Sequence, residues 1–306
     1  MEATFRWVAV AALAPVAWGA NYYITHRYLP ADAPLWGATL RALPAGLLLL
    51  ALARRLPRGA WWWRSAVLGV LNCAAFFVLV YLAAQWLPSG TAAMIMALSP
   101  LAMMLSARLL LAERPHPARL LGGAVGVGGV AVMLADGVGA GGLPGVLAST
   151  GALLAASTGY ALAKRWSDGT PVLASTAWQL TIGGVFLLPL AGAVEGPPPR
   201  VDTVALLAFG FTALIATALA FLAWFAGLRH LPAGTVGLIG LLNPVTGVLL
   251  GTLLAAEPLG PAQLLGMAMV LGGIAVGVRA AGGGRGPVGE QPVTRRTLRR
   301  RRSSLR

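Results

Sequence analysis

One long stretch of the chain occurs twice, and this duplication constrains the fold more than any other feature. Residues 87–132 align without a gap with residues 231–276 at a constant offset, since 257 − 113 = 144 and 244 − 100 = 144. Apolar sequence matches by chance at Leu and Ala, but not at Pro, Glu and Gly with one offset. A period this long indicates a duplicated half-molecule rather than a solenoid of short repeats. The matched residues include Gly90/Gly234, Thr91/Thr235, Pro100/Pro244, Glu113/Glu257, Pro117/Pro261 and Gly122/Gly266.

The composition is that of an integral membrane protein. Of the 306 residues, 58% are hydrophobic and 10% are charged, and the mean hydropathy is +0.77, whereas a soluble domain has about 25% charged residues. The net charge of +14 does not indicate a nucleic-acid partner, because most Arg residues lie in short connections and in the tail. The single cysteine, Cys73, excludes an intrachain disulfide and a cysteine-cluster metal site.

The chain has enough apolar segments for ten spanning helices, each of which needs about 20 residues. We predict an all-α membrane protein with a first repeat at 1–138, a second repeat at 139–279 and a basic, disordered tail at 280–306. Five spans in each repeat give the second copy the opposite orientation, a design that recurs in secondary transporters. The expected helices are 7–25, 34–52, 65–83, 89–111, 120–135, 145–164, 172–194, 204–228, 233–255 and 261–278.

Basic residues predict how the chain is oriented. With both termini in the cytoplasm, nearly all Lys and Arg residues fall on the cytoplasmic side, and the other side keeps only Arg27 and Arg200. This asymmetry predicts a multi-pass protein of the inner or plasma membrane with cytoplasmic termini. The tail, which ends TRRTLRRRRSSLR, has two interpretations. It attaches to anionic lipid, at roughly 1 kcal/mol per Arg near the surface, or it is a topology signal without a further role, which we favour.

Two prolines mark the candidate transport site. Pro100 and Pro244 come near the middle of equivalent helices and remove hydrogen bonds to the carbonyls of Met96 and Gly240, four residues earlier. Paired breaks in both halves of a transporter point to the substrate site. The residues that precede these prolines are Ser99 and Asn243, which restore the lost bond or face a substrate. The alternative is that both prolines only kink helices for packing, and we favour the site.

Other helices carry polar groups and aromatics on one face, which suits a binding cavity. For any single aromatic, packing in the core or against lipid is the commoner role. The asparagines are stronger candidates, because an unpaired amide in hydrocarbon is costly. The candidate substrate-binding residues are therefore Trp18, Asn21, Tyr22, Asn72, Phe76, Ser99, Tyr160, Phe221, Trp224 and Asn243.

The remaining charged residues are interpreted as structural. Arg41 lies inside the second expected helix, and its closest counterpart in the second half is Gln179. It serves as a counter-charge for an anionic group, or it packs between helices and extends its guanidinium toward the interface, which we favour. Glu113 and Glu257 end equivalent helices, and we expect each to cap the next helix. Catalytic triads, phosphate-binding loops and paired carboxylates are absent from the sequence, so we expect no enzyme activity and no cofactor.

The two halves resemble tandem repeats of the EamA-like family in the drug/metabolite transporter superfamily. The matching features are WGANYYITHR, the Arg in PLWGATLRALPAGLLLLAL, and the duplicated segment with its central Pro, its Glu and the Gly-rich helix that follows. The resemblance covers residues 7–278. It implies ten helices, an inner-membrane location and the export of small metabolites, often amino acids or related compounds.

These features predict a secondary transporter, an exporter of small neutral or zwitterionic metabolites that works by alternating access. The alternative is a non-transporting membrane scaffold or accessory subunit held by its basic tail. The inverted duplication and the paired prolines favour the transporter. The expected partners are a small-molecule substrate and the lipid bilayer, with anionic lipid at the tail only under the first interpretation of the tail, and no nucleic acid.

Overall fold

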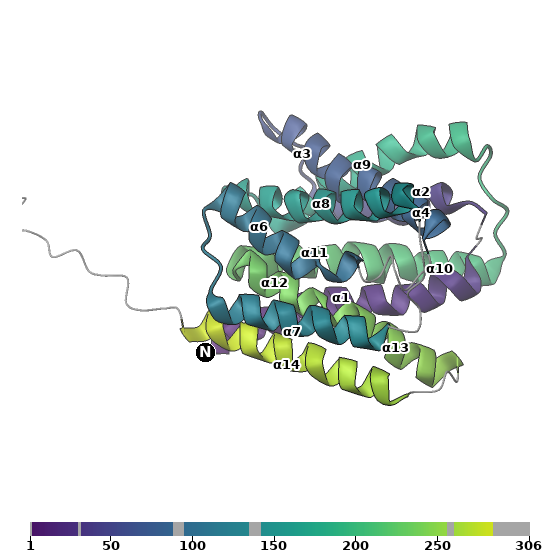
Figure 1. Ribbon diagram of the computed structural model, residues 1–306. Coiled ribbons are helices and arrows are strands. Elements are labelled where there is room, and N and C mark those ends of the chain that lie inside the picture. The colour runs from purple at the N-terminus through teal and green to yellow at the C-terminus, as the bar shows by residue number, and fades with distance from the viewer. Residues whose placement is uncertain (1, 30–31, 88–94, 135–141, 256–259, 284–306) are drawn as a thin grey trace, which may run out of the picture.

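The computed structural model describes residues 2–29, 32–87, 95–134, 142–255 and 260–283, and these residues form an all-helical bundle (Figure 1). Most of the helices run along the same direction, and the N-terminus lies beside the end of the last helix (Figure 1). The helices are α1 (Glu2–Tyr28), α2 (Pro34–Ala53), α3 (Trp61–Gly69), η1 (Val70–Ala74), α4 (Ala75–Trp86), α6 (Ser99–Leu111), α7 (Pro117–Met133), α8 (Leu143–Arg165), α9 (Val172–Val194), α10 (Thr203–Ala213), η3 (Leu214–Leu219), α11 (Ala220–His230), α12 (Ala233–Gly240), α13 (Leu242–Ala255) and α14 (Pro261–Gly283).

Eight segments of the described chain are long and apolar enough to cross a membrane. The all-helical membrane class is therefore confirmed, but the count of ten spans is not. Two of the expected spans correspond to apolar helices that are shorter than the other eight segments. They are α7, for the segment expected at 120–135, and α6, for the segment expected at 89–111. Residues 89–94 of the latter lie outside the described residues, as do Glu257 and the tail beyond Gly283. Several helices are longer than expected, since α1 begins at Glu2 and α14 continues to Gly283.

The third long helix of each half contains a π-helical turn at the equivalent place. The π-helix η1 begins at Val70 and η3 begins at Leu214, and 214 − 70 = 144, the offset of the sequence repeat. A π-turn inserts one extra residue and shifts the hydrogen bonds from i+4 to i+5, as in the bond from the amide of Ala75 to the carbonyl of Val70. Helices 61–86 and 203–230 therefore each consist of two α-helical arms joined by a π-turn.

Equivalent helices of the two halves pack against each other in antiparallel pairs. A Cβ added at Gly129 of α7 would lie 2.6 Å from the carbonyl oxygen of Gly266 of α14, and Gly122 makes the matching approach to Gly273. Since 266 − 122 = 144 and 273 − 129 = 144, each glycine meets the counterpart of its partner. Only glycine permits this approach, because any side chain here would overlap backbone atoms of the facing helix.

The helices α2 and α9 form a second pair of this kind. A Cβ at Gly184 would lie 2.7 Å from that of Leu43, and Gly46 approaches the backbone of Thr181. The offsets agree again, since 184 − 46 = 138 and 181 − 43 = 138. The register also makes Arg41 and Gln179 equivalent, since 179 − 41 = 138.

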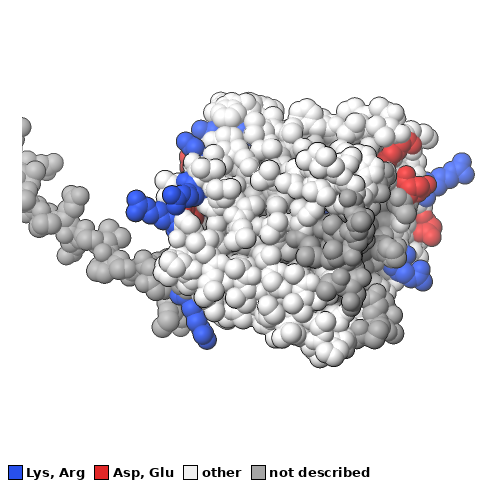
Figure 2. All heavy atoms as spheres, in the orientation of Figure 1, with Lys and Arg blue, Asp and Glu red and all other residues white. Residues whose placement is uncertain are grey.

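Charged residues lie at the two ends of the bundle, and the face between them is uncharged (Figure 2). We call the end that holds the start of α1 the basic end; the α2–α3 connection and the end of α11 also lie there, with Arg54, Arg55, Arg58, Arg64 and Arg229. The opposite end, called the acidic end, holds the α1–α2 and α9–α10 connections, with Asp32, Glu195 and Asp202 together with Arg27 and Arg200. An uncharged belt between two charged ends is the surface expected of a protein that spans a bilayer.

Candidate functional site

Five aromatic side chains from three helices form one buried cluster, called the aromatic cluster: Trp18 of α1, Tyr160 of α8, and Phe221, Trp224 and Phe225 of α11. The ring of Trp224 lies 5.2 Å from Trp18 and 5.5 Å from Tyr160 between centroids, and Trp18 lies 5.6 Å from Phe221. Phe225 closes the cluster at 5.8 Å from Tyr160. Such edge-to-face and tilted contacts are favourable for aromatic pairs. The sequence predicted the other four members; Phe225 follows Phe221 by one helical turn, a spacing that could have indicated it.

A break in a helix lies beside this cluster. The helix that begins at α12 is interrupted at Leu241, and α13 continues with Asn243 and Pro244 in its first turn. A Cβ added at Gly240 would lie 3.3 Å from the indole of Trp224. On the other side of the break, Gly19 of α1 allows close approach to the carbonyl of Asn243. The second proline therefore lies just after a helix break that is flanked by Gly19 of α1 on one side and by Trp224 of the aromatic cluster on the other.

The equivalent break in the first half lies against α12. The structure interrupts the helix at Leu98, and Ser99 and Pro100 open α6. A Cβ added at Gly237 would lie 3.0 Å from the Cα of Pro100. Each predicted proline thus lies in the first turn after a helix interruption. Each half therefore contains a discontinuous helix.

Buried polar atoms without a hydrogen-bond partner lie at and around this region. They include Oδ1 of Asn243, Nε1 of Trp224 and Oδ1 of Asn21, whose Nδ2 donates to Thr25 Oγ1 at 3.2 Å. A buried polar group that lacks a partner costs about 1–3 kcal/mol. These atoms are available to a polar ligand, whose hydrogen bonds would remove that cost.

Two further candidates belong to α1 and α4. Tyr22 lies in α1, between Asn21 and Tyr23, and its side chain is outside the described residues. Phe76 contacts Phe77 at 5.6 Å between ring centroids and packs against the same apolar core as the aromatic cluster.

Asn72 forms a buried amide pair that the sequence did not reveal. Its Nδ2 donates to Oε1 of Gln179 at 2.8 Å, and both side chains are buried. Its Oδ1 has no partner and faces Gly159 of α8, where a Cβ would overlap it. Because Gly159 directly precedes Tyr160 in α8, the amide pair lies next to the aromatic cluster.

Arg41 reaches from α2 to η3. Its Nε donates to Thr217 Oγ1 at 3.0 Å, its Nη2 donates to the Ala216 carbonyl at 3.3 Å, and its guanidinium lies 4.8 Å from the centre of the Phe77 ring. The Ala216 carbonyl also accepts a bond from Trp18 Nε1 at 3.0 Å. Arg41 therefore packs between helices, and it shares an acceptor with a member of the aromatic cluster instead of extending to the interface.

At the basic end, Glu113 ties the two halves together. Its Oε1 pairs with Lys164 Nζ at 2.7 Å, and its Oε2 accepts a hydrogen bond from the Ala233 amide at 3.1 Å. The left-handed conformation of Ala112, with φ 55°, ends α6 directly before this side chain. The expectation that Glu113 caps the next helix was wrong, because it caps α12 instead. His116 caps α7, and its Nδ1 accepts from the Ala118 amide.

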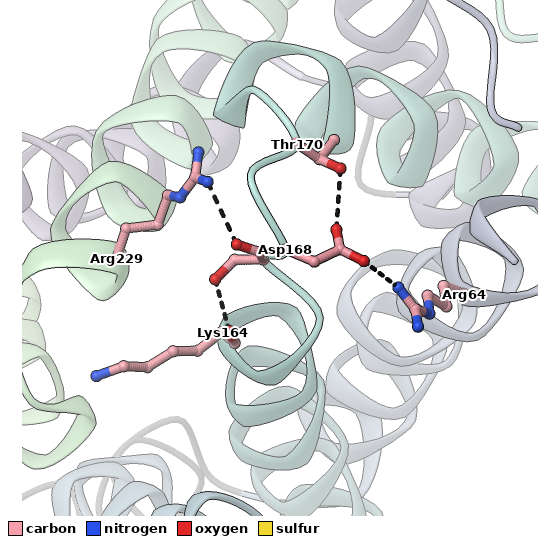
Figure 3. A network of polar contacts seen from close by, with 6 residues as sticks. Arg64, Lys164, Asp168, Thr170 and Arg229 are labelled. Atoms are coloured by element: carbon pink, nitrogen blue, oxygen red, sulfur yellow. Dashed lines mark hydrogen bonds and ion pairs between the residues drawn. The ribbon is translucent and has the colours of Figure 1, made fainter. Parts of the chain in front are cut away.

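A second tie at the same end holds the loop between α8 and α9 (Figure 3). Arg64 of α3 pairs with Asp168 at 2.8 Å, and Thr170 donates to the same carboxylate. Arg229 of α11 donates to the Ser167 carbonyl at 3.4 Å. The hydrogen bond from Arg64 is the main cause that lowers the pKa of Asp168 below its ordinary value. Two helices, α3 and α11, are therefore fastened to the loop that joins α8 and α9.

Below this loop lies a narrow crevice of about 20 Å³. Trp61 and Leu68 of α3 form one wall, and Ser175 and Gln179 of α9 form part of the other. The volume suits a water molecule and not a metabolite. Phe221 and Trp224, at the centre of the aromatic cluster, are each only 2% exposed. The cluster is therefore closed in this conformation.

Comparison with known proteins agrees with this architecture. Residues 5–135 and 143–279 each match the profile of the EamA-like transporter family. The chain is 34% identical over 272 residues to Protein PecM of Dickeya dadantii, covering 86% of this chain and 89% of that protein. It is 27% identical to an uncharacterized inner membrane transporter, YedA, of Escherichia coli K12, with 84% and 85% covered.

Two more comparisons add a named function and a fold. A probable terminal-alkyne amino-acid exporter of Streptantibioticus cattleyicolor is 28% identical over 282 residues, covering 88% of this chain and 86% of that protein. A solved crystal structure with 22% identity superposes with a TM-score of 0.79 over 90% of this chain and 97% of the other; at this identity it supports the fold alone.

The chain belongs to the EamA-like transporter family. It is therefore a multi-pass membrane protein related to transporters, not to enzymes, as the sequence predicted.

Proposed function

We propose that this protein is a secondary transporter that exports small neutral or zwitterionic metabolites, amino acids or related compounds, by alternating access. Its scaffold is two inverted repeats, 1–138 and 139–279, each with five membrane-crossing segments once α6 and α7 are counted. The support for the inversion is the antiparallel packing of α2 on α9 and of α7 on α14, in which each glycine meets the counterpart of its partner. Repeats of this kind open a central site to one side and then to the other.

The observation that carries the proposal is that the aromatic cluster lies beside the break between α12 and α13. Just after this break, the amide oxygen of Asn243 is buried and has no hydrogen-bond partner. Aromatic rings can pack against an apolar group of a substrate. The amide oxygen of Asn243 can accept a hydrogen bond from a substrate, and the indole N–H of Trp224 can donate one. The sequence has no Asp or Glu inside the apolar segments, so the site suits a neutral or zwitterionic compound better than a polycation. One relative is named as an amino-acid exporter, which agrees with that chemistry.

Metabolite profiling tests the function. Medium from cells that express the protein is compared with medium from cells that express Asn243→Ala at equal membrane level. We expect one or a few compounds to be enriched only with the unsubstituted protein, and their efflux to be reproduced in proteoliposomes. Identical media, together with no efflux of amino acids from proteoliposomes, would contradict the proposal.

We further propose that the protein lies in the cell membrane with both termini cytoplasmic, which makes the basic end the cytoplasmic one. The support is the concentration of Arg at that end. Single cysteines at Ser89 and Ala280, in a Cys73→Ala background, are labelled in intact cells with an impermeant thiol reagent. We expect labelling at position 89 only. Labelling at position 280 but not at 89 would reverse the orientation.

A further inference from the structure

The amide pair and the Arg41 contacts are two versions of one arrangement. Arg41 and Gln179 occupy equivalent places on α2 and α9, as the offset of 138 shows. Each side chain crosses to the π-turn of the opposite half: Arg41 donates to the backbone carbonyl of Ala216 in η3, and Gln179 accepts from the side-chain amide of Asn72 in η1. Asn72 and Ala216 are also equivalent, since 216 − 72 = 144. We call these two contacts the Arg clamp and the Gln clamp.

The π-turn η3 leaves a backbone carbonyl out of its normal pairing, and the Arg clamp supplies a partner for it. In an α-helix the amide of Ala220 would donate to the carbonyl of Ala216, but here it donates to Ile215 and Thr217. The Ala216 carbonyl instead accepts from Arg41 and Trp18. In an apolar environment a backbone carbonyl without a partner is costly. The Arg clamp therefore stabilises η3 in its π-helical form.

The two clamps differ in strength. The Arg clamp joins the guanidinium to a hydroxyl, a carbonyl and the Phe77 ring, and hydrogen bonds from a charged donor are about twice as strong as neutral ones. The Gln clamp has one hydrogen bond between neutral amides, and the Asn72 Oδ1 remains unpaired.

Each clamp also lies between an arm of the third helix and the opposite half. The arm α3 packs on α9 at the basic end, and α10 packs on α2 at the acidic end. The crevice of about 20 Å³ lies among α3, α8, α9 and α11, and Gln179 is one of its lining residues. The crevice at the basic end therefore reaches the weaker clamp.

We propose that Arg41 and Gln179 are positioning residues of the transport cycle, each holding the opposite π-turn as a hinge, and that their unequal strength makes the basic end open first. This rests on the proposed alternating access. Release of the Gln clamp, together with the Arg64–Asp168 pair, lets α3 swing at η1 and opens the basic end, whereas release of the Arg clamp lets α10 swing at η3 and opens the acidic end. An exporter whose weaker clamp faces the cytoplasm opens first toward its cytoplasmic substrate.

The native Cys73 is a built-in probe for the hinge η1, because it is fully buried beside Asn72. Its alkylation by a maleimide is timed in the purified full chain, without substrate. A probe for η3 is Ala218→Cys in a Cys73→Ala background, since Ala218 is also buried. Gln179→Leu should speed labelling of Cys73 about tenfold, the effect of one net hydrogen bond, and should slow labelling at position 218.

Arg41→Gln should have the reverse effect, with labelling at position 218 at least tenfold faster and labelling of Cys73 slower. This reciprocity separates a positioning role from a structural one, because general loosening speeds labelling at both probes. Matched controls are Thr176→Val in α9 and Thr39→Val in α2, which remove buried hydroxyls and should leave both rates unchanged. If Gln179→Leu or Arg41→Gln fails to fold, Asn72→Ser and Thr217→Val weaken the same clamps from the other side.

Rates that rise at both probes together, or that change at neither, would overturn the clamps. Reciprocal rates in a protein for which no exported compound is found would support the clamps and contradict only the substrate assignment.

Discussion

The third long helices of the two halves share one backbone design and carry different side chains. Both bend through a π-turn at the same place in the repeat. After the turn, the second half presents Phe221, Trp224 and Phe225 to the aromatic cluster, whereas the equivalent residues of the first half are Phe77, Val80 and Tyr81. The duplicated scaffold has therefore kept its π-turns, while four of the five members of the aromatic cluster come from the second half and only Trp18 comes from the first.

Under the proposed function, this difference separates the parts that move from the parts that bind. The glycine contacts and π-turns are repeated, as two halves that pack and bend in the same way would require. The aromatic residues of α11 are not repeated, as expected if they contact a small substrate that has no two-fold symmetry. Substitutions at equivalent positions of the two halves should accordingly give equal effects in the scaffold and unequal effects at the site.

The largest difference is expected between Trp224→Ala and Val80→Ala, which change equivalent positions since 224 − 80 = 144. Trp224→Ala removes the centre of the aromatic cluster and should lower the stability by about 3–5 kcal/mol and transport by at least about a hundredfold. Val80→Ala removes less volume from a half-buried position and should cost about 1 kcal/mol. Thermal unfolding in detergent and proteoliposome efflux measure both. Equal losses of efflux would show that the site is shared by the halves.

The asparagine at the helix break should matter more than its counterpart. Asn243→Ala removes a group available to substrate and should weaken transport by about ten- to a hundredfold, corresponding to about 1–3 kcal/mol. Ser99→Ala, at the equivalent position, should reduce transport by less than about fivefold. Efflux is measured at matched membrane levels. A larger loss with Ser99→Ala would move the site to the first half.

Alanine substitutions in the glycine pairs should give equal effects in both halves. Gly129→Ala and Gly273→Ala each force α7 and α14 apart at equivalent places and should cost about 1 kcal/mol or more. Gly128→Ala and Gly272→Ala are matched controls, since a Cβ there meets only the end of Met269 or nothing. Unfolding temperatures in detergent check the comparison, and a cost at only one of the pair would contradict the two-fold packing.

The smallest effect is expected from the tie between Arg64 and Asp168 at the basic end. Because the pKa of Asp168 is lowered in the folded protein, its contribution is present above the ordinary Asp pKa and is lost as pH falls through the lowered value. Both side chains are partly exposed, so Asp168→Asn should cost less than about 1 kcal/mol at pH 7. Unfolding at pH 7 and at about pH 3 tests this. A difference between Asp168→Asn and the unsubstituted protein that grows on acidification would contradict the sign.

Residue order alone predicted the family, the helical membrane class and the repeat. These features depend on composition, on apolar segment length and on identities at one offset, all of which are local or periodic. It also named Trp18, Tyr160, Phe221 and Trp224, because aromatic residues at helical spacing share a face whatever lies opposite.

Contacts between distant helices required the tertiary structure. The π-turns have no proline or glycine signal, because an extra residue in a helix is stabilised by what packs beside it, here Arg41 and Trp18 on one carbonyl. The partner of Asn72 lies 107 residues away, and the helix that Glu113 caps lies 120 residues away. Only the register in which helices of the two halves meet decides such pairs, and that register follows from close packing at glycines such as Gly46 and Gly184.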